Sequence, residues 1–272
     1  MSRSLFDIKD KVIVITGATG VLGGVMTKGL AARGAKLVLI GRNEDKFKTL
    51  IDEAKTSSWD IQTYAGNVLD QNRMNQICQE AVSAFGKIDI LINAAGGNMP
   101  GGIIGPDQNI LDLDVDGTRQ TMDLNYMGSV IPTQAFLEPM IKSGNGNVIN
   151  ISSMSAQQPL TRVMGYSSSK AAIDNYTKWL AVELASKYGE GFRVNAIAPG
   201  FFLTQQNKTL LTNNDGSLTD RGEQIVEHTP YKRFGDPEEL VGTLIWLCSD
   251  ASKFVTGTII PVDGGFSAYS GV

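Results

Sequence analysis

Residues 12–23 read VIVITGATGVLG, a short apolar run followed by a turn with glycine at positions 17, 20 and 23. A helical pattern follows directly, with apolar residues at every third or fourth position between residues 26 and 33. Glycines in such a turn permit a tight bend, a close approach of the backbone to a pyrophosphate and close packing of helix on strand. The helix N-terminus adds partial positive charge that favours an anion. The stretch therefore predicts a strand, a dinucleotide-binding turn and a helix, the alternative being an ordinary strand-to-helix turn.

Six further apolar runs recur along the chain with helical stretches between them: residues 37–40, 61–65, 88–92, 147–151, 193–197 and 258–262. Short runs that are apolar at nearly every position are typical of strands buried on both faces. Gly34 and Gly86 stand just after two helical stretches as stop signals. We therefore expect an α/β protein, a Rossmann-type doubly wound parallel sheet of about seven strands with helices on both faces. Without a linker or an internal repeat in the sequence, residues 1–272 are predicted to form one domain.

The composition excludes several classes of protein. The 24 Lys and Arg against 28 Asp and Glu give a net charge of −4, and no basic run offers a surface for nucleic acid. Cys78, Cys248 and the single His228 are too few for a zinc site of the usual kind, so no metal is expected. No run approaches the ~18 apolar residues of a membrane span, and charges interrupt residues 1–11, where a signal peptide would be apolar. We expect a cytoplasmic protein with no membrane partner.

Two segments interrupt the alternation of strands and helices. Residues 97–117 form a long connection rich in Gly and Asp, and residues 205–235 contain a turn at 213–216 between two short polar helical stretches. Connections of this length are usually functional in compact domains. Because ligands of open α/β sheets bind beyond the carboxyl ends of the strands, and both segments follow strands, they are predicted to be a substrate-side loop and a lid.

A pair of residues with acid–base chemistry follows the strand at 147–151. Tyr166 and Lys170 are four residues apart and would share one face of a helix, downstream of Ser152 and Ser153. An unperturbed phenol has a pKa of about 10, and a nearby ammonium group lowers it. Such a tyrosine can exchange a proton with a carbinol oxygen. On spacing alone, an ordinary exposed pair on a helix surface is the simpler interpretation.

The end of the second strand bears on the choice of dinucleotide. Arg42 stands about 20 residues beyond the glycine-rich turn, where an acidic residue would accept the hydroxyls of the adenosine ribose. A guanidinium group suits a 2′-phosphate instead. Arg42 therefore favours NADP over NAD, the alternative being a solvated arginine in a protein that accepts NAD.

In their order and spacing, these motifs resemble the short-chain dehydrogenase/reductase family over nearly the whole chain. Tyr166 and Lys170 match its Tyr-x-x-x-Lys, Ser153 its substrate-orienting serine and Asn125 its catalytic asparagine. The resemblance implies an NAD(P)-dependent oxidoreductase that acts on CH–OH donors and interconverts a ketone and a secondary alcohol. Tyr166 would be the general acid and base, Ser153 a hydrogen-bond donor to the reacting oxygen, Lys170 the group that holds the ribose and lowers the Tyr166 pKa, and Asn125 the holder of a relay water.

The residues that the resemblance assigns to the dinucleotide follow successive strands: Gly17, Thr19, Gly20, Val21, Leu22, Gly23, Arg42, Asn67, Val68, Asn93, Ala94, Ala95, Gly96, Tyr166, Lys170, Pro199, Gly200, Phe202 and Thr204. Two positions depart from the family pattern. Val21 stands where members with this catalytic set usually have Gly, so that the spacing of the turn is more like that of the extended branch. Asn67 replaces an Asp that usually lies beside the adenine.

The loop 97–117, the lid 205–235 and residues 263–272 resemble a bacterial branch of the family, the D-mannonate oxidoreductases or fructuronate reductases. A sugar acid needs a cation for its carboxylate and polar groups for its hydroxyls. The candidates are Asn98, Gln157, Arg162, Lys208 and Arg221, with Gln158, Gln206, Lys232 and Arg233 as further groups near the predicted mouth. For any single one of these residues, a solvated surface position is the simpler interpretation.

Other functions and a quaternary structure follow from the same sequence. The alternatives are a short-chain reductase of another carbonyl compound, such as a sugar, a polyol or a 3-oxoacyl thioester, and a non-catalytic dinucleotide-sensing regulator. The presence of both Tyr166 and Lys170 disfavours the regulator. Residues 111–141 and 168–188 are apolar on more than one side, which predicts a homo-oligomer, a tetramer or a dimer.

Overall fold

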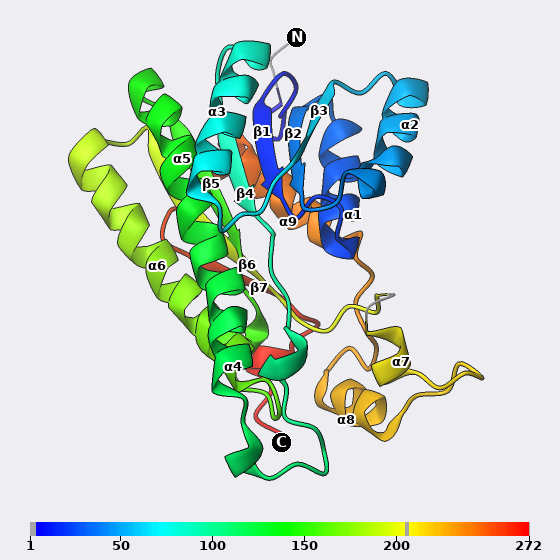
Figure 1. Ribbon diagram of the computed structural model, residues 1–272. Helices are drawn as coiled ribbons and strands as arrows, with labels where there is room; N and C mark the ends of the chain where they lie inside the picture. Colours follow the sequence, from blue (N-terminus) through cyan, green and yellow to red (C-terminus); the bar gives the residue numbers. More distant parts are fainter. Residues whose placement is uncertain (1–3, 205–206, 272) are drawn as a thin grey trace.

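A seven-stranded, entirely parallel sheet forms the centre of the computed structural model, which describes residues 4–204 and 207–271 (Figure 1). The strand order is β3-β2-β1-β4-β5-β6-β7. The strands are β1 (Val12–Thr16), β2 (Lys36–Gly41), β3 (Ile61–Ala65), β4 (Ile90–Asn93), β5 (Gly146–Ile151), β6 (Phe192–Pro199) and β7 (Ile259–Val262). The predicted Rossmann-type fold and its seven strands are confirmed, with strand ends that differ from the prediction by no more than 2 residues.

Helices cover both faces of the sheet. On one face lie α1 (Val21–Ala31), α2 (Lys48–Ser57) and α9 (Glu239–Cys248), and on the other α3 (Gln71–Phe85), α5 (Gly128–Ser143) and α6 (Met164–Tyr188) (Figure 1). Single turns of 3₁₀-helix lie at Glu44–Phe47, Pro100–Gly102, Ile110–Asp112, Met154–Ala156, Asp250–Ser252 and Phe266–Ala268. Among residues 4–204 and 207–271, no helix combines the length and the apolar character that a membrane crossing requires.

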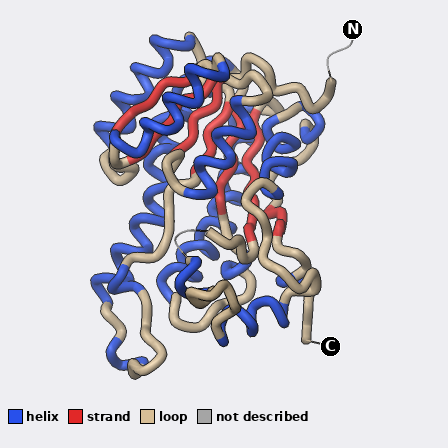
Figure 2. Tube along the Cα trace, turned by 90° about the vertical axis from the view of Figure 1, so that its right-hand side faces the viewer, coloured by secondary structure: helices blue, strands red, loops and turns tan. Residues whose placement is uncertain are grey.

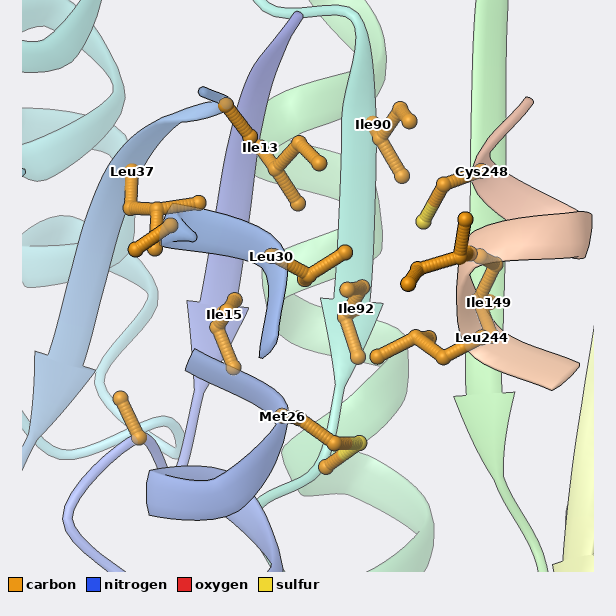
Figure 3. Packing of buried hydrophobic residues seen from close by; sticks show 14 of the residues in the cluster. Ile13, Ile15, Met26, Leu30, Leu37, Ile90, Ile92, Ile149, Leu244 and Cys248 are labelled. Carbon is orange, nitrogen blue, oxygen red and sulfur yellow. The ribbon is translucent and has the colours of Figure 1, made fainter. Parts of the chain in front are cut away.

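The two faces of the sheet explain why its strands are apolar at nearly every position. In β1, Ile13 and Ile15 point into the core shared with α1 and α9, whereas Val12 and Val14 point into the core shared with α3, α5 and α6. Figure 3 shows the first of these cores, where Met26 and Leu30 of α1 lie against the isoleucines of three strands. Successive side chains of a strand point to opposite faces, so most positions in a sheet covered on both sides are apolar.

The two segments predicted to be loop and lid lie beyond one end of the sheet (Figure 2). The prediction that the loop runs to residue 117 is wrong, because α4 (Val115–Met122) begins inside it. Asp114 caps α4 by accepting hydrogen bonds from the backbone N–H groups of Asp116 and Gly117. The lid contains α7 (Lys208–Leu211) and α8 (Asp220–His228), which are the two short helices that the sequence predicts. Its first residues, Gln205 and Gln206, lie outside the described part of the chain.

The glycine-rich turn is packed backbone against backbone. Gly17 has a φ of +68°, and a Cβ atom on it would lie 2.7 Å from the carbonyl oxygen of Ala94. A Cβ on Gly23, in the first turn of α1, would lie 2.1 Å from the carbonyl oxygen of Gly17. The turn therefore leaves no room for side chains at positions 17 and 23, whatever it binds.

Gly23→Ala is expected to lower the free energy of unfolding by about 1–3 kcal/mol or more, because the new methyl group meets backbone that cannot move away. The matched control is Gly24→Ala in the same helix, where a Cβ would lie 3.9 Å from its nearest neighbour. That change should be neutral or stabilising, by up to about 1 kcal/mol, because alanine favours a helix. Urea unfolding of both variants provides the measurement. Equal midpoints for the two variants would contradict the packing described above.

Candidate active site

The N-terminus of α1 lies at the carboxyl end of β1 and is suited to an anion. Gly20 is its N-cap residue, with no side chain to cap the helix, and the first turn contains no acidic residue. The first backbone N–H groups of a helix have no partner within the helix and carry partial positive charge. Thr19 packs against Gly41 at the end of β2, where a Cβ would lie 3.0 Å from the threonine Oγ1. The residues of this turn therefore fit a dinucleotide pyrophosphate, with Val21 and Leu22 in the first turn of α1.

The turn after β4 is held against the end of β1. The Thr16 hydroxyl oxygen accepts hydrogen bonds from the backbone N–H groups of Ala94 and Ala95, at 3.1 and 3.2 Å. The Asn93 side chain is buried and donates to Thr133 Oγ1 and Asn150 Oδ1, both at 2.9 Å. Asn93 therefore ties β4 to β5 and α5, and its side chain is directed into the protein rather than toward a ligand.

Asn125 joins this turn to the helices that follow. It lies in one turn of π-helix, Asp123–Met127, between α4 and α5, and it is fully buried. Its Oδ1 accepts from the Gly97 N–H at 3.0 Å, and its Nδ2 donates to the carbonyl oxygens of Gly97 and Thr121, at 2.8 and 2.7 Å. A Cβ on Gly96 would lie 2.6 Å from Asn125 Oδ1 and 3.4 Å from Lys170 Nζ. Asn125 and Lys170 therefore border the same small space beside Gly96.

Ser153, Tyr166 and Lys170 lie together at the end of β5 and the start of α6. The Ser155 hydroxyl donates to Ser153 Oγ at 3.0 Å, which leaves the Ser153 proton for a hydrogen bond to the Tyr166 side chain. The Lys170 ammonium lies 5.5 Å from the centre of the Tyr166 ring and donates to the carbonyl oxygen of Ile151 at 2.7 Å. Among the sequence-predicted residues, these three therefore form one constellation, with Asn125 next to it.

The acidity of Tyr166 differs from the expectation. Burial raises the pKa of Tyr166, and the hydrogen bond from Ser153 opposes that rise, whereas the sequence predicted that Lys170 lowers it. Lys170 lies over the face of the ring, with one of its protons directed at Ile151, and burial lowers its own pKa to about 8. In this chain the hydrogen bond from Ser153 favours the phenolate, and burial outweighs it.

Asp174 is a member of this site that the sequence analysis missed. It stands one helical turn beyond Lys170, is 9% exposed, and accepts a hydrogen bond from the Ser152 hydroxyl at 2.5 Å. Its negative charge raises the pKa of Lys170 against the effect of burial. Burial in turn raises the pKa of Asp174, and the Ser152 hydrogen bond and two lysines oppose that rise. Its position four residues after Lys170, on the same face of the helix, was the signal in the sequence.

The remaining residues assigned to the dinucleotide fall into two groups. Arg42 and Asn67 are exposed at the carboxyl ends of β2 and β3, and Thr204 donates to Asn207 Oδ1 just beyond β6. Val68 and Phe202, by contrast, have side chains buried in the two cores. Pro199 ends β6. A Cβ on Gly200 would lie 2.6 Å from the backbone of Asp263, the residue after β7, so this contact excludes a side chain at position 200.

Two of the predicted substrate residues come together, and the others do not. Arg162 and Arg221 line one cavity, whereas Asn98, Gln157 and Lys208 are exposed. Gln158 donates to the carbonyl oxygen of Ser267, and Gln206 lies outside the described residues. In the part of the chain that the structure describes, no three His, Cys, Asp or Glu side chains are grouped so that they could hold a metal ion.

A family model described as enoyl-(acyl carrier protein) reductase matches residues 17–267. The chain is 42% identical to the uncharacterised oxidoreductase UxuB of Bacillus subtilis, with 98% of each chain covered. It is 33% identical to a 2-dehydro-3-deoxy-D-gluconate 5-dehydrogenase of Formosa agariphila, over 100% of this chain and 98% of the relative. The chain belongs to the short-chain dehydrogenase/reductase family. It is therefore an NAD(P)-dependent dehydrogenase or reductase.

Solved structures of the family agree with the fold. A protein of Haemophilus influenzae, proposed to be a D-mannonate oxidoreductase and solved with bound NAD, is 43% identical, with 98% of each chain covered and a TM-score of 0.90. A gluconate 5-dehydrogenase from Burkholderia cenocepacia, solved with NADP and tartrate, is 29% identical, with a TM-score of 0.85 over 97% of this chain and 98% of that one. Members of this family act on small carbonyl and alcohol substrates, and so does this chain.

Asp174→Asn is expected to move the alkaline limb of the pH profile of kcat/KM to lower pH. The carboxylate raises the Lys170 pKa, so its removal lets that pKa fall below about 8 and the ammonium is lost earlier as pH rises. Initial rates measured from about pH 6 to about pH 10 give the size of the shift. The control is Ser152→Ala, which keeps the charge and should shift the profile less. Superimposable profiles of Asp174→Asn and wild type would disprove the coupling.

Proposed function

We propose that this short-chain dehydrogenase/reductase interconverts the ketone and the secondary alcohol of a sugar acid, D-fructuronate and D-mannonate or a similar hexuronate and aldonate. The observation that carries the reaction type is the grouping of Ser153, Tyr166 and Lys170 at the end of β5, beside Asn125. The sugar-acid class is supported by the relatives named for mannonate, gluconate and 2-dehydro-3-deoxygluconate. We also propose that residues 1–272 are one dinucleotide-binding and catalytic domain.

Each residue of the group has a separate task in the proposed mechanism. Tyr166 gives its phenolic proton to the carbonyl oxygen in reduction and takes it back in oxidation. Ser153 donates a hydrogen bond to the same oxygen and stabilises the charge that develops on it. Lys170 holds the ribose next to the nicotinamide, and Asn125 keeps a water that returns protons to solvent. A bound nicotinamide dinucleotide supplies the hydride, and the residues above orient the substrate toward it.

The raised pKa of Tyr166 favours the protonated phenol, which is the form that reduction requires. In oxidation the same group must lose its proton, and Ser153 helps by donating to the phenolate. In the reductive direction the proposed substrates are ketones, whose oxygen accepts the Tyr166 proton. The alternative substrates are a 3-oxoacyl thioester, another sugar or a polyol. Comparing kcat/KM for each of them with kcat/KM for the sugar acids distinguishes these alternatives.

The dinucleotide is NAD or NADP, and we propose that NADP is preferred. Arg42 is exposed at the carboxyl end of β2, next to the glycine-rich turn, and no acid occupies this position. Two related structures contain NAD and NADP respectively, so that both dinucleotides fit this fold.

We also propose a homo-oligomer, a tetramer or a dimer, assembled in part through α6. Trp179 and Val182, three residues apart on this helix, are 55% and 67% exposed, and neighbouring exposed apolar side chains are typical of subunit interfaces. Gel filtration with light scattering measures the assembly.

Tyr166→Phe is expected to lower kcat for the sugar-acid ketone by about 10²–10⁴-fold, since the proton donor is lost while the ring remains. Initial rates with fructuronate, tagaturonate and a keto-gluconate, each with NADH and NADPH, give the substrate and cofactor together. Dinucleotide affinity should stay near the wild-type value, which fluorescence titration checks. Turnover above a few per cent of wild type in the folded variant would refute the assignment. Tight dinucleotide binding by the wild type without turnover of any carbonyl compound would favour the regulator.

Arg42→Ala is expected to raise the KM for NADPH by about tenfold or more and to leave the KM for NADH nearly unchanged, because only the 2′-phosphate loses a partner. Steady-state kinetics with both dinucleotides at a saturating ketone concentration provides the measurement. A proportional change in both KM values would show that Arg42 does not read the 2′-phosphate.

A further inference from the structure

A cavity of about 400 Å³ lies between the lid and the segment that leads into α6. The lid contributes the end of α7, the turn after it and the start of α8, and the other wall is Arg162, two residues before α6 begins. Its lining residues are Arg162, Leu210, Asn213, Thr219, Asp220 and Arg221. The cavity therefore joins two segments far apart in the sequence, one of which continues directly into the helix of Tyr166.

Both arginines of this cavity are held by well-defined backbone. Arg162 adopts a left-handed conformation, with a φ of +73°, and its carbonyl oxygen accepts from the N–H of Ile104 at 2.9 Å. A non-glycine residue in this conformation is strained and persists only when its surroundings impose it. Because four residues of chain span at most about 14 Å, the Arg162 backbone lies within that distance of the Tyr166 backbone.

Arg221 is fixed by the cap of α8. Thr219 Oγ1 accepts from the Gly222 N–H at 3.1 Å, and the same hydroxyl donates to the carbonyl oxygen of Leu210 at 2.7 Å. A Cβ on Gly222 would lie 2.2 Å from the carbonyl oxygen of Leu211, so that α8 packs directly on the end of α7. The guanidinium group of Arg221 is therefore carried by a compact helix pair rather than by a free loop.

The two guanidinium groups form a pair of like charge without a counter-ion. Within residues 4–204 and 207–271, neither forms an ion pair or a side-chain hydrogen bond, and the exposed carboxylate of Asp220 in the same cavity pairs with neither of them. Burial lowers the pKa of Arg221, and the positive charge of Arg162 lowers it further. Two neighbouring arginines that lack an acid are a ready site for an anion.

The other cations near the mouth are engaged or lie apart. Arg233 forms a double hydrogen bond with Glu239, at 2.7 Å for each N–O pair, and Lys232 donates to the carbonyl oxygen of Glu227 at 2.6 Å. Lys208 is exposed and does not line the cavity. Of the five cations that the sequence offered for a substrate carboxylate, the structure thus leaves Arg162 and Arg221.

We propose that Arg162 and Arg221 together bind the carboxylate of a sugar-acid substrate, which thereby bridges the lid helix α8 and the catalytic helix α6. This inference rests on the proposed function, since it requires an anionic substrate. Two planar guanidinium forks can donate parallel hydrogen bonds to both carboxylate oxygens. Binding of the acid group in this way selects sugar acids against the corresponding neutral sugars.

The test compares Arg162→Gln and Arg221→Gln with wild type, all saturated with NADPH, which cannot oxidise D-mannonate, by calorimetric titration with D-mannonate. Neutral D-mannitol and D-mannitol 1-phosphate serve as further ligands, because the polyol lacks the charge of the acid and the phosphate ester carries about −1.5 to −2 near pH 7 in its place. The control is Arg33→Gln, which removes one charge from an exposed arginine between α1 and β2, at the opposite end of the strands. Arg221→Lys keeps the charge and loses the fork, and melting temperatures report the folding of each variant.

We expect each glutamine variant to weaken D-mannonate binding by about tenfold to a hundredfold and to leave binding of NADPH and of the neutral polyol unchanged. Arg33→Gln should bind like wild type, and Arg221→Lys should lie between wild type and Arg221→Gln. We call the proposed binding of one carboxylate by Arg162 and Arg221 the clamp. Equal weakening for mannonate and mannitol, or unchanged mannonate binding in both variants, would overturn it. Tighter binding of the phosphate ester than of the acid would overturn its assignment to a carboxylate.

Failure of the clamp and failure of the proposed function give different results. Arginine-dependent binding of mannonate without any turnover of sugar acids leaves the clamp in place and disproves the function. Turnover of neutral ketones that depends on Tyr166, with no binding of any sugar acid by the wild type, supports the oxidoreductase chemistry and disproves the clamp.

Discussion

The contact of backbone with backbone at the end of β1 is the constraint on which the rest of the site depends. Gly17 lies against the turn after β4, and Gly23 lies against Gly17, at distances where no side chain fits. Thr16 adds two hydrogen bonds to the same turn. The ends of β1 and β4 and the N-terminus of α1 are thereby brought to one point. Asn125 then ties the turn after β4 to the catalytic helices through Gly97.

Beside these strand ends, the Lys170 ammonium group is buried. Taking an ammonium group out of water is costly unless its protons and its charge are compensated. Lys170 has a hydrogen bond to Ile151 and an acid, Asp174, one turn away, and its pKa nevertheless falls to about 8. The group therefore titrates close to neutral pH, where small changes of its surroundings alter its charge. Sites that work by proton transfer commonly contain groups tuned in this way.

The site has two parts with different physical character. The dinucleotide side is built on strand ends and buried hydrogen bonds, with little freedom to vary. The substrate side is built from the lid and the segment before α6, which meet around a cavity with two uncompensated arginines. Differences in substrate within a family commonly lie on such loop segments. The carboxylate site that we propose at Arg162 and Arg221 is a difference of this kind.

The sequence by itself determined the fold, the glycine turn before α1 and the placement of Tyr166 and Lys170 on one helical face, because these depend on local patterns. Strands buried on both faces are apolar throughout, a glycine turn precedes a helix, and Tyr166 and Lys170 share one helical face by their spacing. Asp174 was missed because an acid on a long helix is usually solvated, and only packing shows it to be buried. Only the tertiary structure showed that Asn93 and Phe202 face the interior, and that burial raises the pKa of Tyr166 against the hydrogen bond from Ser153. Only the tertiary structure showed that Arg162 and Arg221, among the five candidate cations, line the same cavity. Their proximity depends on how α8 packs against the rest of the chain, and the local sequence around either residue does not encode it.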